Sequence, residues 1–471
     1  MTRLISEIIA NSGIAFGTSG ARGLVQNFTP DVCTAFTQSF LKTLSCRYPF
    51  HAVALAIDNR PSSPAIAQYC AGTIQALGLA VRYYGVLPTP ALALQAMADG
   101  MPAIMITGSH IPFDRNGIKF YRPDGEISKV DEQQILSCHE LLIQAKAIPL
   151  SAEQLAADNY LQRYRAICAP DCFHGKHFGI YEHSCAGREL YYQILTELGA
   201  KVTRLERSSE FVPIDTEAVS VTDQHKARQW SATYHFDAIF STDGDGDRPL
   251  IADNQGNWLR GDTVGLLTAQ ALGISAIAVP VNANSAIDLC GSFIEVKRTR
   301  IGSPYVIEAM QYLLERYSSV AGFEANGGFL LASDVQLEGA TLTALPTRDA
   351  LLPFIMIMLR AGVQPLSDLV AALPQRFTAS ERIQRVTAEQ SQRFLAQAAE
   401  QPNHILQQLG INSRCTEDVD RTDGVRIRLQ NGNILHFRAS GNAPELRIYS
   451  EAATAEDACN LAHQGSLLKL V

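Results

Sequence analysis

The chain of 471 residues is too long for one hydrophobic core and predicts three or four domains, because a domain typically contains about 100 to 200 residues. Its composition, 46% hydrophobic and 18% charged residues, is that of a globular protein. A net charge of −8 without a basic run excludes the electrostatic pattern of a nucleic-acid-binding or membrane-surface protein. A phosphorylated substrate is not excluded, because a few local arginines suffice to bind it.

No segment predicts export or membrane insertion. The sequence MTRLISEIIANSGIAF lacks the uninterrupted apolar core of a signal peptide. The most apolar stretch, residues 350–359, is about half as long as a membrane-spanning helix. Ten cysteines at irregular spacing favour free thiols in a reducing compartment, so we expect a cytoplasmic protein.

The first third of the chain alternates short apolar runs with helical spacing. AVALAI at 52–57 and PAIMIT at 102–107 are expected strands, and AIAQYCAGTIQALG at 65–78 is an expected helix followed by the strand-like AVRYYG. This alternation is typical of α/β units with a largely parallel sheet. Similar strand-like runs recur at 177–184, 237–242, 276–281 and 318–328. Repeated α/β modules are therefore expected.

From about residue 371 onward the pattern changes. VRIRLQ and ILHFRA flank Asn431 and Gly432, an Asn-Gly pair that signals a β-hairpin. LRIYSEA then precedes a helical pattern, so we expect a smaller C-terminal α+β domain. The expected domains are 1–150, 151–260, 261–370 and 371–471.

Three aspartates alternate with glycines in STDGDGDRPL, directly after an apolar segment. Asp243, Asp245 and Asp247 can point three carboxylates at one place, where they would repel each other without a cation. An EF-hand would need glycine at Arg248 and glutamate at Asn254. A site for a hard divalent cation such as Mg²⁺ is favoured over a plain acidic turn.

Ser109 lies in TGSHIPFDRNGIKFY, residues 107–121, behind an expected buried strand. His110 and Lys119 are close enough in sequence to share its pocket. A serine hydroxyl carries a phosphoryl group only where a metal and cations offset the charge. The stretch alone favours a serine that caps a turn. Beside the aspartate loop, the interpretation as phosphoryl carrier becomes the stronger one.

Two glycine-rich loops could bind an anion or a sugar. FGTSGARG carries Arg22 and fits neither the dinucleotide nor the P-loop pattern, although its backbone N–H groups could still face an anion. A solvated turn is the alternative. Glu324 and Asn326 lie between glycines in GFEANGG and form a plausible pair for sugar hydroxyls.

RASGNAPELRIY places two arginines around a small-residue turn. Arg438 and Arg447, with Ser440 and Asn442 between them, could form a bidentate cradle for a phosphate. An ordinary connection with two solvated arginines is the alternative.

Cysteine and histidine cluster in CAPDCFHGKH. Cys168, Cys172, His174 and His177 are possible zinc ligands, but their spacing matches no common structural zinc pattern. A polar loop with incidental thiols is the favoured interpretation.

These loops, in this order, resemble those of the α-D-phosphohexomutases, and within them the bacterial phosphomannomutases. The family's serine loop, T-[AG]-S-H-N-P…N-G-x-K, matches Thr107–Pro112 and Asn116–Lys119 except at Ile111. Its metal loop, D-G-D-G-D-R, is present unaltered at 243–248. The resemblance extends over essentially the whole chain.

The other two family loops match with departures. The sugar loop, G-E-x-S-G-H, is matched loosely from Phe323, with Asn326 in place of serine and Gly328 in place of histidine. The phosphate loop, R-x-S-G-T-E-P, has Asn442 and Ala443 in place of threonine and glutamate. Sugar preference is therefore inferred less directly than phosphate binding.

The resemblance implies an α/β protein of four domains around a central cleft, namely three similar α/β domains with mixed sheets and a C-terminal α+β domain. It implies an isomerase in which phosphorylated Ser109 exchanges a phosphoryl group between the 1- and 6-positions of a hexose phosphate. One Mg²⁺ held by Ser109 and the three aspartates, and a hexose 1,6-bisphosphate as activator, are implied in the same way.

Residue roles follow from the same resemblance. Lys119, His110 and Arg22 would join Ser109 in catalysis, with the general base unassigned. The implied substrate-binding residues are Arg248, Gly302, Glu324, Asn326, Arg438, Ser440, Gly441, Asn442 and Arg447.

The implied substrates are mannose 6-phosphate and mannose 1-phosphate, which feed GDP-mannose and surface-polysaccharide synthesis. Phosphoglucomutase or phosphoglucosamine mutase activity is the alternative within the family. A non-catalytic sugar-phosphate-binding protein is the alternative of another class, but it would not need a phosphoryl-carrying serine. The expected partners are small-molecule hexose phosphates, with no nucleic acid and no membrane, and the expected assembly is a monomer or a homodimer.

Overall fold

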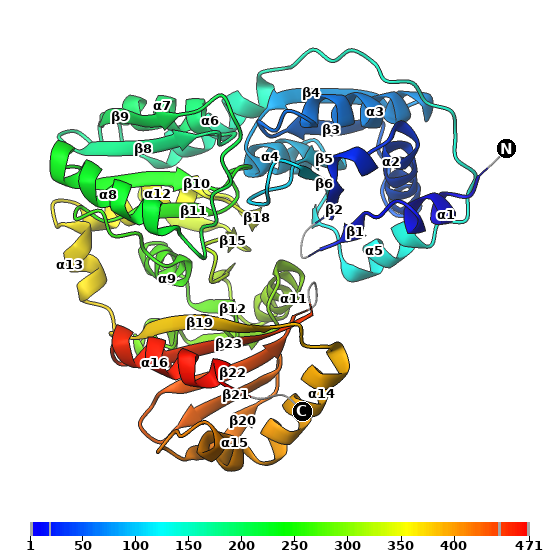
Figure 1. Ribbon diagram of the computed structural model, residues 1–471. Coiled ribbons are helices and arrows are strands. Elements are labelled where there is room, and N and C mark those ends of the chain that lie inside the picture. The colour runs from blue at the N-terminus through cyan, green and yellow to red at the C-terminus, as the bar shows by residue number, and fades with distance from the viewer. Residues whose placement is uncertain (1–2, 18–19, 441–443, 469–471) are drawn as a thin grey trace.

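Four main β-sheets follow one another along the part of the chain that the structure describes (Figure 1). This computed structural model describes residues 3–17, 20–440 and 444–468. In Figure 1 the first sheet and its helices lie at the upper right, the second at the upper left and the fourth at the bottom. Across these described residues, no helix is both long and apolar enough to cross a membrane.

The first sheet is mixed and has seven strands. Its strands, in sheet order, are β1 (Ala15–Phe16), β2 (Ala21–Leu24), β6 (Arg115–Arg122), β5 (Ala103–Ile106), β3 (Ala52–Ile57) and β4 (Ala80–Val86), with β7 (Gly125–Glu126) beside β6. The expected strands β3 and β5 are confirmed, but the expectation of a largely parallel sheet is wrong here. β6 runs antiparallel to β5 because residues 107–114 contain no crossover helix, so the chain folds directly back.

Helices cover both faces of this sheet. One face packs on α1 (Ile5–Ala10), α2 (Pro30–Ser45), α3 (Ser63–Ala76) and α5 (Lys129–Leu136), with the short 3₁₀ helix η1 (Val25–Asn27) before α2. The other face packs on α4 (Thr89–Ala98), which faces the next two sheets. The helix expected at 65–78 is confirmed as α3.

The second and third sheets each combine a parallel part with antiparallel edge strands. The second contains β11 (Pro249–Ala252), β10 (Ala238–Thr242), β8 (His177–His183) and β9 (Lys201–Arg207), with α6 (Leu155–Ile167), α7 (Arg188–Glu197) and α8 (Val221–Tyr234). The third contains β13 (Glu295–Thr299), β12 (Ala276–Pro280), β14 (Val320–Phe323), β15 (Phe329–Leu331) and β18 (Leu345–Arg348). Around it lie the hairpin β16 (Val335–Leu337) and β17 (Ala340–Leu342), and helices α9 (Gly261–Ala271), α10 (Ala286–Leu289), α11 (Ser303–Leu314), α12 (Leu351–Ala361) and α13 (Leu366–Ala371).

One hydrophobic core runs through these first three sheets without a break. Leu92 of α4, Tyr160 of α6, Phe240 of β10, Phe323 of β14 and Phe354 of α12 all belong to it. The rings of Phe240 and Phe354 stack with centroids 4.7 Å apart. Since burial of apolar surface is the main stabilising contribution to folding, this shared core fixes the three sheets relative to one another.

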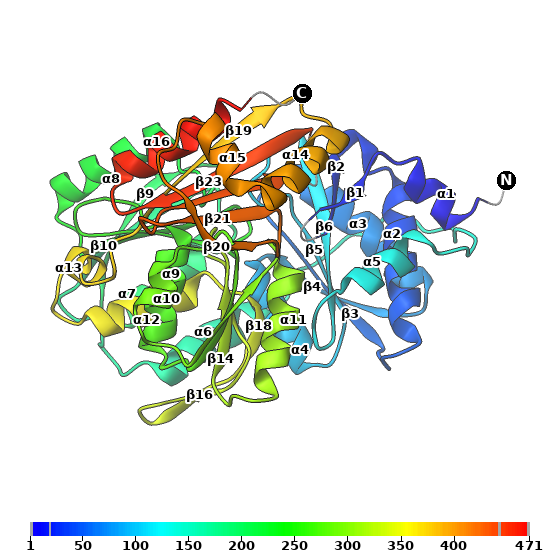
Figure 2. The ribbon, with the colours of Figure 1, turned by 90° about the horizontal axis from the view of Figure 1, so that it is seen from below.

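The fourth sheet is antiparallel throughout and has its own core. Its strands are β19 (Phe377–Gln384), β23 (Glu445–Ala452), β22 (Ile434–Ala439), β21 (Val425–Leu429) and β20 (Cys415–Asp420), and its helices are α14 (Ala388–Glu400), α15 (Pro402–Gln408) and α16 (Ala455–Ser466). The expected Asn-Gly hairpin is confirmed between β21 and β22, with Gly432 at φ +81°. Figure 2 shows α14, α15 and α16 in front of this sheet when it is seen from below, so its other face is turned toward the rest of the molecule.

Polar contacts join the fourth sheet to the third. Across the junction, the carboxylate of Glu451 accepts a hydrogen bond from the Ser285 backbone N–H at 3.0 Å, while Arg376 Nε, next to β19 of the fourth sheet, donates to the same carboxylate at 2.8 Å. Asp423 accepts one from the Ile301 backbone N–H at 2.9 Å. This junction is thus polar, in contrast to the apolar core that unites the other three sheets.

We predict that Asp349→Ala destabilises the shared core. Asp349 is 1% exposed and accepts hydrogen bonds from the hydroxyls of Tyr160 and Tyr164, which α6 contributes. Each buried polar group left unpaired costs about 1–3 kcal/mol, so the free energy of unfolding should fall by about 3 kcal/mol or more. Thermal unfolding should show a lower midpoint, whereas Glu338→Ala, at an exposed turn, should leave it unchanged; equal midpoints for both variants would contradict the prediction.

Candidate active site

Three predicted site residues, and Asp58 beside them, follow the carboxyl ends of parallel strands. Asp58 follows β3, Ser109 follows β5, Asp243 follows β10 and Glu324 follows β14. The carboxyl ends of parallel strands are the usual location of ligand sites in α/β proteins. The shared core therefore holds these four loops at one place.

Asp243, Asp245 and Asp247 form a buried cluster whose ligand atoms all lie within 4.8 Å of one another. Among the described residues, Asp245 Oδ1 and Asp247 Oδ1 have no hydrogen-bond partner, although both atoms are buried. Gly246 has φ +71°, and a Cβ on Gly244 would lie 2.7 Å from the Ser109 carbonyl oxygen, so the loop needs both glycines. Three carboxylates, two of them with an oxygen that accepts no hydrogen bond among the described residues, fit a hard divalent cation such as Mg²⁺.

Two basic side chains from other sheets offset the charge of this cluster. Lys119 of β6 donates to Asp245 Oδ2 at 2.5 Å and to Asp247 Oδ2 at 2.7 Å. Arg348 of β18 donates from Nε to Asp247 Oδ2 at 3.1 Å, and Thr89 of α4 donates to Asp245 Oδ2 at 2.8 Å. These donors occupy the Oδ2 atoms of Asp245 and Asp247 and leave the Oδ1 atoms for a cation.

The three carboxyl groups differ in acidity. Burial raises the pKa of Asp243 well above its usual range, and the charges of Asp245 and Asp247 add to the rise. Burial acts in the same direction on Asp247, but Arg348, Lys119 and Arg248 outweigh it and hold the pKa of Asp247 below its usual range. For Asp245, Lys119 outweighs burial and the charge of Asp247, so this pKa is also lowered. The three groups therefore do not ionise at the same pH unless a further cation is bound.

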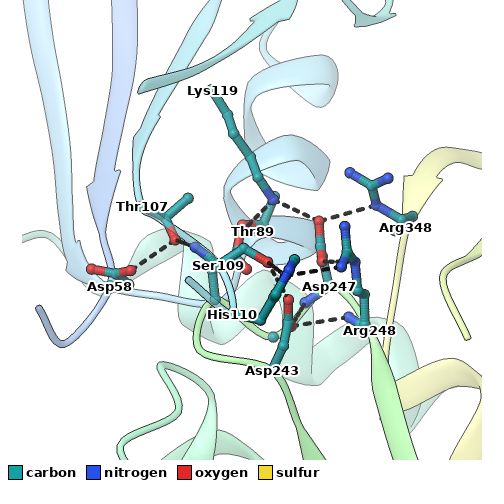
Figure 3. Close-up of polar contacts among 12 residues, drawn as sticks. Asp58, Thr89, Thr107, Ser109, His110, Lys119, Asp243, Asp247, Arg248 and Arg348 are labelled. Carbon is teal, nitrogen blue, oxygen red and sulfur yellow. Dashed lines mark hydrogen bonds and ion pairs between the residues drawn. The ribbon is translucent and has the colours of Figure 1, made fainter. Parts of the chain in front are cut away.

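Ser109 is fully buried and points its hydroxyl at this cluster, as Figure 3 shows. Its Oγ donates to Asp243 Oδ2 at 2.5 Å. The backbone at Ser109 has φ +55°, a left-handed conformation that non-glycine residues seldom adopt. Thr107 Oγ1 accepts from the Ser109 N–H at 2.8 Å and itself donates to Asp58 at 2.7 Å, which holds this conformation.

Arg60, which the sequence analysis did not identify, holds the serine loop in place through hydrogen bonds to its backbone. Its guanidinium donates to the carbonyl oxygens of four loop residues and pairs with Asp58 Oδ2 at 3.1 Å. The four carbonyls are those of Ser109 at 2.9 Å, Ile111 at 2.5 Å, Pro112 at 2.8 Å and Arg115 at 2.9 Å. The contact at Ile111 uses the backbone, and nothing in the structure explains why its side chain departs from the family pattern.

His110, Arg248 and Arg22 complete the basic side of the site. Arg248 Nη1 donates to His110 Nδ1 at 3.1 Å, and His110 Nδ1 lies 3.5 Å from Ser109 Oγ. Burial, followed by the charge of Arg248, lowers the pKa of His110 to about 4, so the ring is neutral at pH 7. Burial, again with Arg248, lowers the pKa of Arg22 to about 10, which still leaves Arg22 charged.

The residues of the sugar loop lie beside this cluster. Glu324 is 4% exposed and accepts from Arg348 Nη1 at 2.9 Å. Asn326 closes the turn by accepting from the Gly328 N–H at 3.0 Å. Gly302 stands at the start of α11 with φ +132°.

The residues of the phosphate loop lie on the fourth sheet, away from the serine loop. Arg438 and Arg447 are direct neighbours across β22 and β23, on the face that also carries His436 and Tyr449 and is turned toward the other sheets. Arg438 pairs with Asp423 at 2.8 Å, and Arg447 pairs with Glu445 at 3.0 Å. Ser440 ends this stretch of described chain, and Gly441 and Asn442 lie outside the described residues.

In CAPDCFHGKH the structure brings the thiols of Cys168 and Cys172 into contact, whereas the ring of His177 contacts a different partner. Cys168 follows the end of α6, Cys172 and His174 lie in the next turn, and His177 begins β8, where its Nε2 lies 2.9 Å from Thr203 Oγ1. Within the described ranges, the only group of three possible metal ligands is the aspartate cluster. All ten cysteines are free thiols.

The site residues that sequence reasoning missed are Asp58, Arg60, Thr89 and Arg348. Asp58 and Arg60 had a usable signal, because DNRPSSP places both directly after a strand that neighbours the strand before Ser109. Arg348 had a weaker one, an Arg-Asp pair next to a strongly apolar helix. Thr89 had none.

Three sequence models of a single protein family match this chain. The model described as "Phosphoglucomutase/phosphomannomutase, alpha/beta/alpha domain I" matches residues 13–142, that of domain III matches 260–377, and that of the C-terminal domain matches 365–465. The chain belongs to the phosphoglucomutase/phosphomannomutase family of α-D-phosphohexomutases. Its members are mutases, which are isomerases, so the expected family and enzyme class are confirmed.

Individual relatives agree with this assignment. A phosphomannomutase of Salmonella muenchen is 54% identical over 455 residues, which are 97% of this chain and 95% of that protein. A phosphomannomutase of Sinorhizobium fredii is 42% identical over 470 residues, 96% of this chain and 98% of that one. The crystal structure of a family protein from Burkholderia thailandensis has the same fold, with TM-score 0.73 and 17% identity over 96% of this chain and 98% of that one.

We predict that Arg60→Lys lowers kcat through the serine loop. A lysine keeps the charge but cannot hold four carbonyls at once, so Ser109 should shift. A displacement of about 1 Å at a reacting group can cost about a hundredfold in rate, with KM for the sugar phosphate little changed. Arg165→Lys, at an exposed ion pair with Glu197, is the matched control. A folded Arg60→Lys variant with the kcat of the parent would contradict the positioning role.

We predict that Asp245→Asn abolishes binding of Mg²⁺, because it removes one charge and the free Oδ1 carboxylate oxygen from the cluster. Titration calorimetry with Mg²⁺ measures this directly, without any turnover. The exposed Asp99→Asn variant should bind Mg²⁺ as the parent does. Unchanged Mg²⁺ affinity in Asp245→Asn would remove the loop from metal binding.

Proposed function

We propose that this enzyme interconverts mannose 6-phosphate and mannose 1-phosphate through a phosphorylated Ser109 and a hexose 1,6-bisphosphate. The observation that carries the proposal is the Ser109 hydroxyl, which donates to Asp243 at 2.5 Å within a cluster of carboxylates and cations. The mannose assignment rests on the 54% identity with a relative named phosphomannomutase. The proposed setting is the cytoplasm, where the product would feed GDP-mannose and surface-polysaccharide synthesis.

In the proposed reaction, a hydroxyl oxygen of the sugar monophosphate bonds to phosphorus as the bond from phosphorus to Ser109 Oγ breaks. The hydroxyl proton passes to a base that we leave unassigned. The bisphosphate then turns and returns its other phosphoryl group to Ser109. Lys119, Arg22 and Arg248 would stabilise the transferring oxygens, with His110 beside Ser109.

Mg²⁺, held by Ser109, Asp243, Asp245 and Asp247, would offset charge on the transferring phosphoryl group. The fit rests on the two buried Oδ1 atoms that take no hydrogen bond among the described residues. A hexose 1,6-bisphosphate would act as activator by phosphorylating Ser109 in the resting enzyme.

The remaining residues would hold the substrate. Arg438, Ser440 and Arg447, with Gly441 and Asn442, would bind the phosphate that does not react, so that its binding energy orients the distant hydroxyl. Glu324, Asn326, Gly302 and Arg248 would bind the sugar. In this proposal each main sheet marks one domain, with limits at 1–150, 151–260, 261–370 and 371–471, in a monomer or a homodimer.

The functional test compares kcat/KM for mannose 1-phosphate, glucose 1-phosphate and glucosamine 1-phosphate, each with the matching bisphosphate. We expect the highest value for mannose 1-phosphate. A preference for glucose or glucosamine 1-phosphate would contradict the mannose assignment and leave a phosphohexomutase of another specificity.

The phosphoserine step has its own control within the same assay. Ser109→Ala should lower kcat by at least about 10⁴-fold, as expected when a nucleophile is removed, while the exposed Ser137→Ala should keep the parent rate. Full turnover by Ser109→Ala with bisphosphate supplied would rule out the phosphoserine mechanism and favour a different carrier.

A further inference from the structure

Arg348 joins two loops that belong to different sheets. Its side chain is 1% exposed. From Nε it donates to Asp247 in the metal loop at 3.1 Å, and from Nη1 it donates to Glu324 in the sugar loop at 2.9 Å. Figure 3 shows Arg348 reaching Asp247 from the side opposite Ser109. One planar guanidinium thus sets the distance between a carboxylate of the metal cluster and the carboxylate of the sugar loop.

The course of this side chain explains a departure from the family pattern. A Cβ on Gly328 would lie 2.2 Å from Arg348 Cδ and 2.8 Å from Cγ. Gly328 is not in the left-handed region, so space and not backbone conformation requires glycine there. Position 328 is where the family loop carries histidine. No side chain can stand at 328 while the stem of Arg348 passes through that space.

We propose that Arg348 is a positioning residue: it fixes Asp247 and Glu324 against each other, and position 328 is glycine because the stem of Arg348 passes beside it. The role of Glu324 toward the sugar rests on the proposed function, whereas the link to Asp247 does not. A guanidinium suits this place because its N–H groups diverge in one rigid plane toward two carboxylates. A lysine offers one nitrogen and cannot hold both in a fixed geometry.

Loss of Arg348 has two separate consequences. Asp247 would keep its hydrogen bond from Lys119 but lose the one from Arg348 that orients its carboxylate, which should weaken binding of Mg²⁺. Partners that orient a metal ligand typically contribute about 10–100-fold in metal affinity. Glu324 would be left in a buried position without its cation, which should raise KM for the sugar phosphate.

The test uses Arg348→Lys, Arg348→Gln and Arg348→Ala, with Mg²⁺ affinity from calorimetry and KM and kcat from the mutase assay. We expect Mg²⁺ affinity to fall about 10–100-fold and KM to rise, with Lys not rescuing either value. In Arg348→Ala, added guanidinium ion at non-denaturing concentration should partly restore the Mg²⁺ affinity and partly lower KM. Parent values of Mg²⁺ affinity in folded Arg348→Gln and Arg348→Lys would overturn the proposal.

A double-mutant cycle tests the steric part without any substrate. Gly328→Ala should lower the thermal midpoint in the parent but have little further effect in Arg348→Ala, because the colliding stem is then absent. Equal effects of Gly328→Ala in both backgrounds would overturn the proposal. If the parent enzyme shows no mutase activity, the proposed function fails, but calorimetry and this cycle still decide the role of Arg348.

Discussion

The arrangement of the molecule depends on the charge of three buried carboxylates. Asp243, Asp245 and Asp247 lie within 4.8 Å of one another, where burial alone would keep them from ionising together. Lys119 from the first sheet and Arg348 from the third sheet offset that charge, together with Arg248 of the aspartate loop itself. Since two of these three cations come from other sheets, the charge of the cluster is fully offset only when all three sheets are in place. Neutralisation of the buried carboxylates and packing of the domains are therefore coupled in this protein.

The first three sheets are joined by an apolar core, and the fourth is joined to the third by polar contacts; the two kinds of junction have different consequences for the site. A continuous apolar core fixes the first three sheets, so Ser109, the metal loop and the sugar loop stand at constant positions. The fourth sheet has a separate core and meets the third through polar contacts such as that of Glu451 with the Ser285 backbone N–H. Interfaces of this polar kind permit relative motion more readily than a shared core does. That suits a domain proposed to hold a substrate that must turn between two reactions.

The sequence predicted those parts of the site whose residues are neighbours in the chain. The aspartate loop and the serine loop each carry their chemistry within a few residues, and the strands before them have clear apolar patterns. Arg60 and Arg348 escaped prediction because their partners are distant, 49 residues away for Ser109 and 101 for Asp247. From the sequence, Gly328 was a departure from the family loop without a reason, and the stem of Arg348 gives it a steric one. The antiparallel β6 was missed because strand direction depends on the length of a connection more than on composition.

Transfer of a phosphoryl group from Ser109 to the sugar is the central claim, and a labelled single turnover tests it most directly. Enzyme charged with ³²P at Ser109 is mixed rapidly with unlabelled mannose 1-phosphate, and the label is followed on the millisecond scale. The account predicts that label leaves Ser109 at least as fast as turnover and appears first at C6 of mannose 1,6-bisphosphate. Label that remains on Ser109 while mannose 6-phosphate forms at the full rate, or that is released as inorganic phosphate, would contradict it.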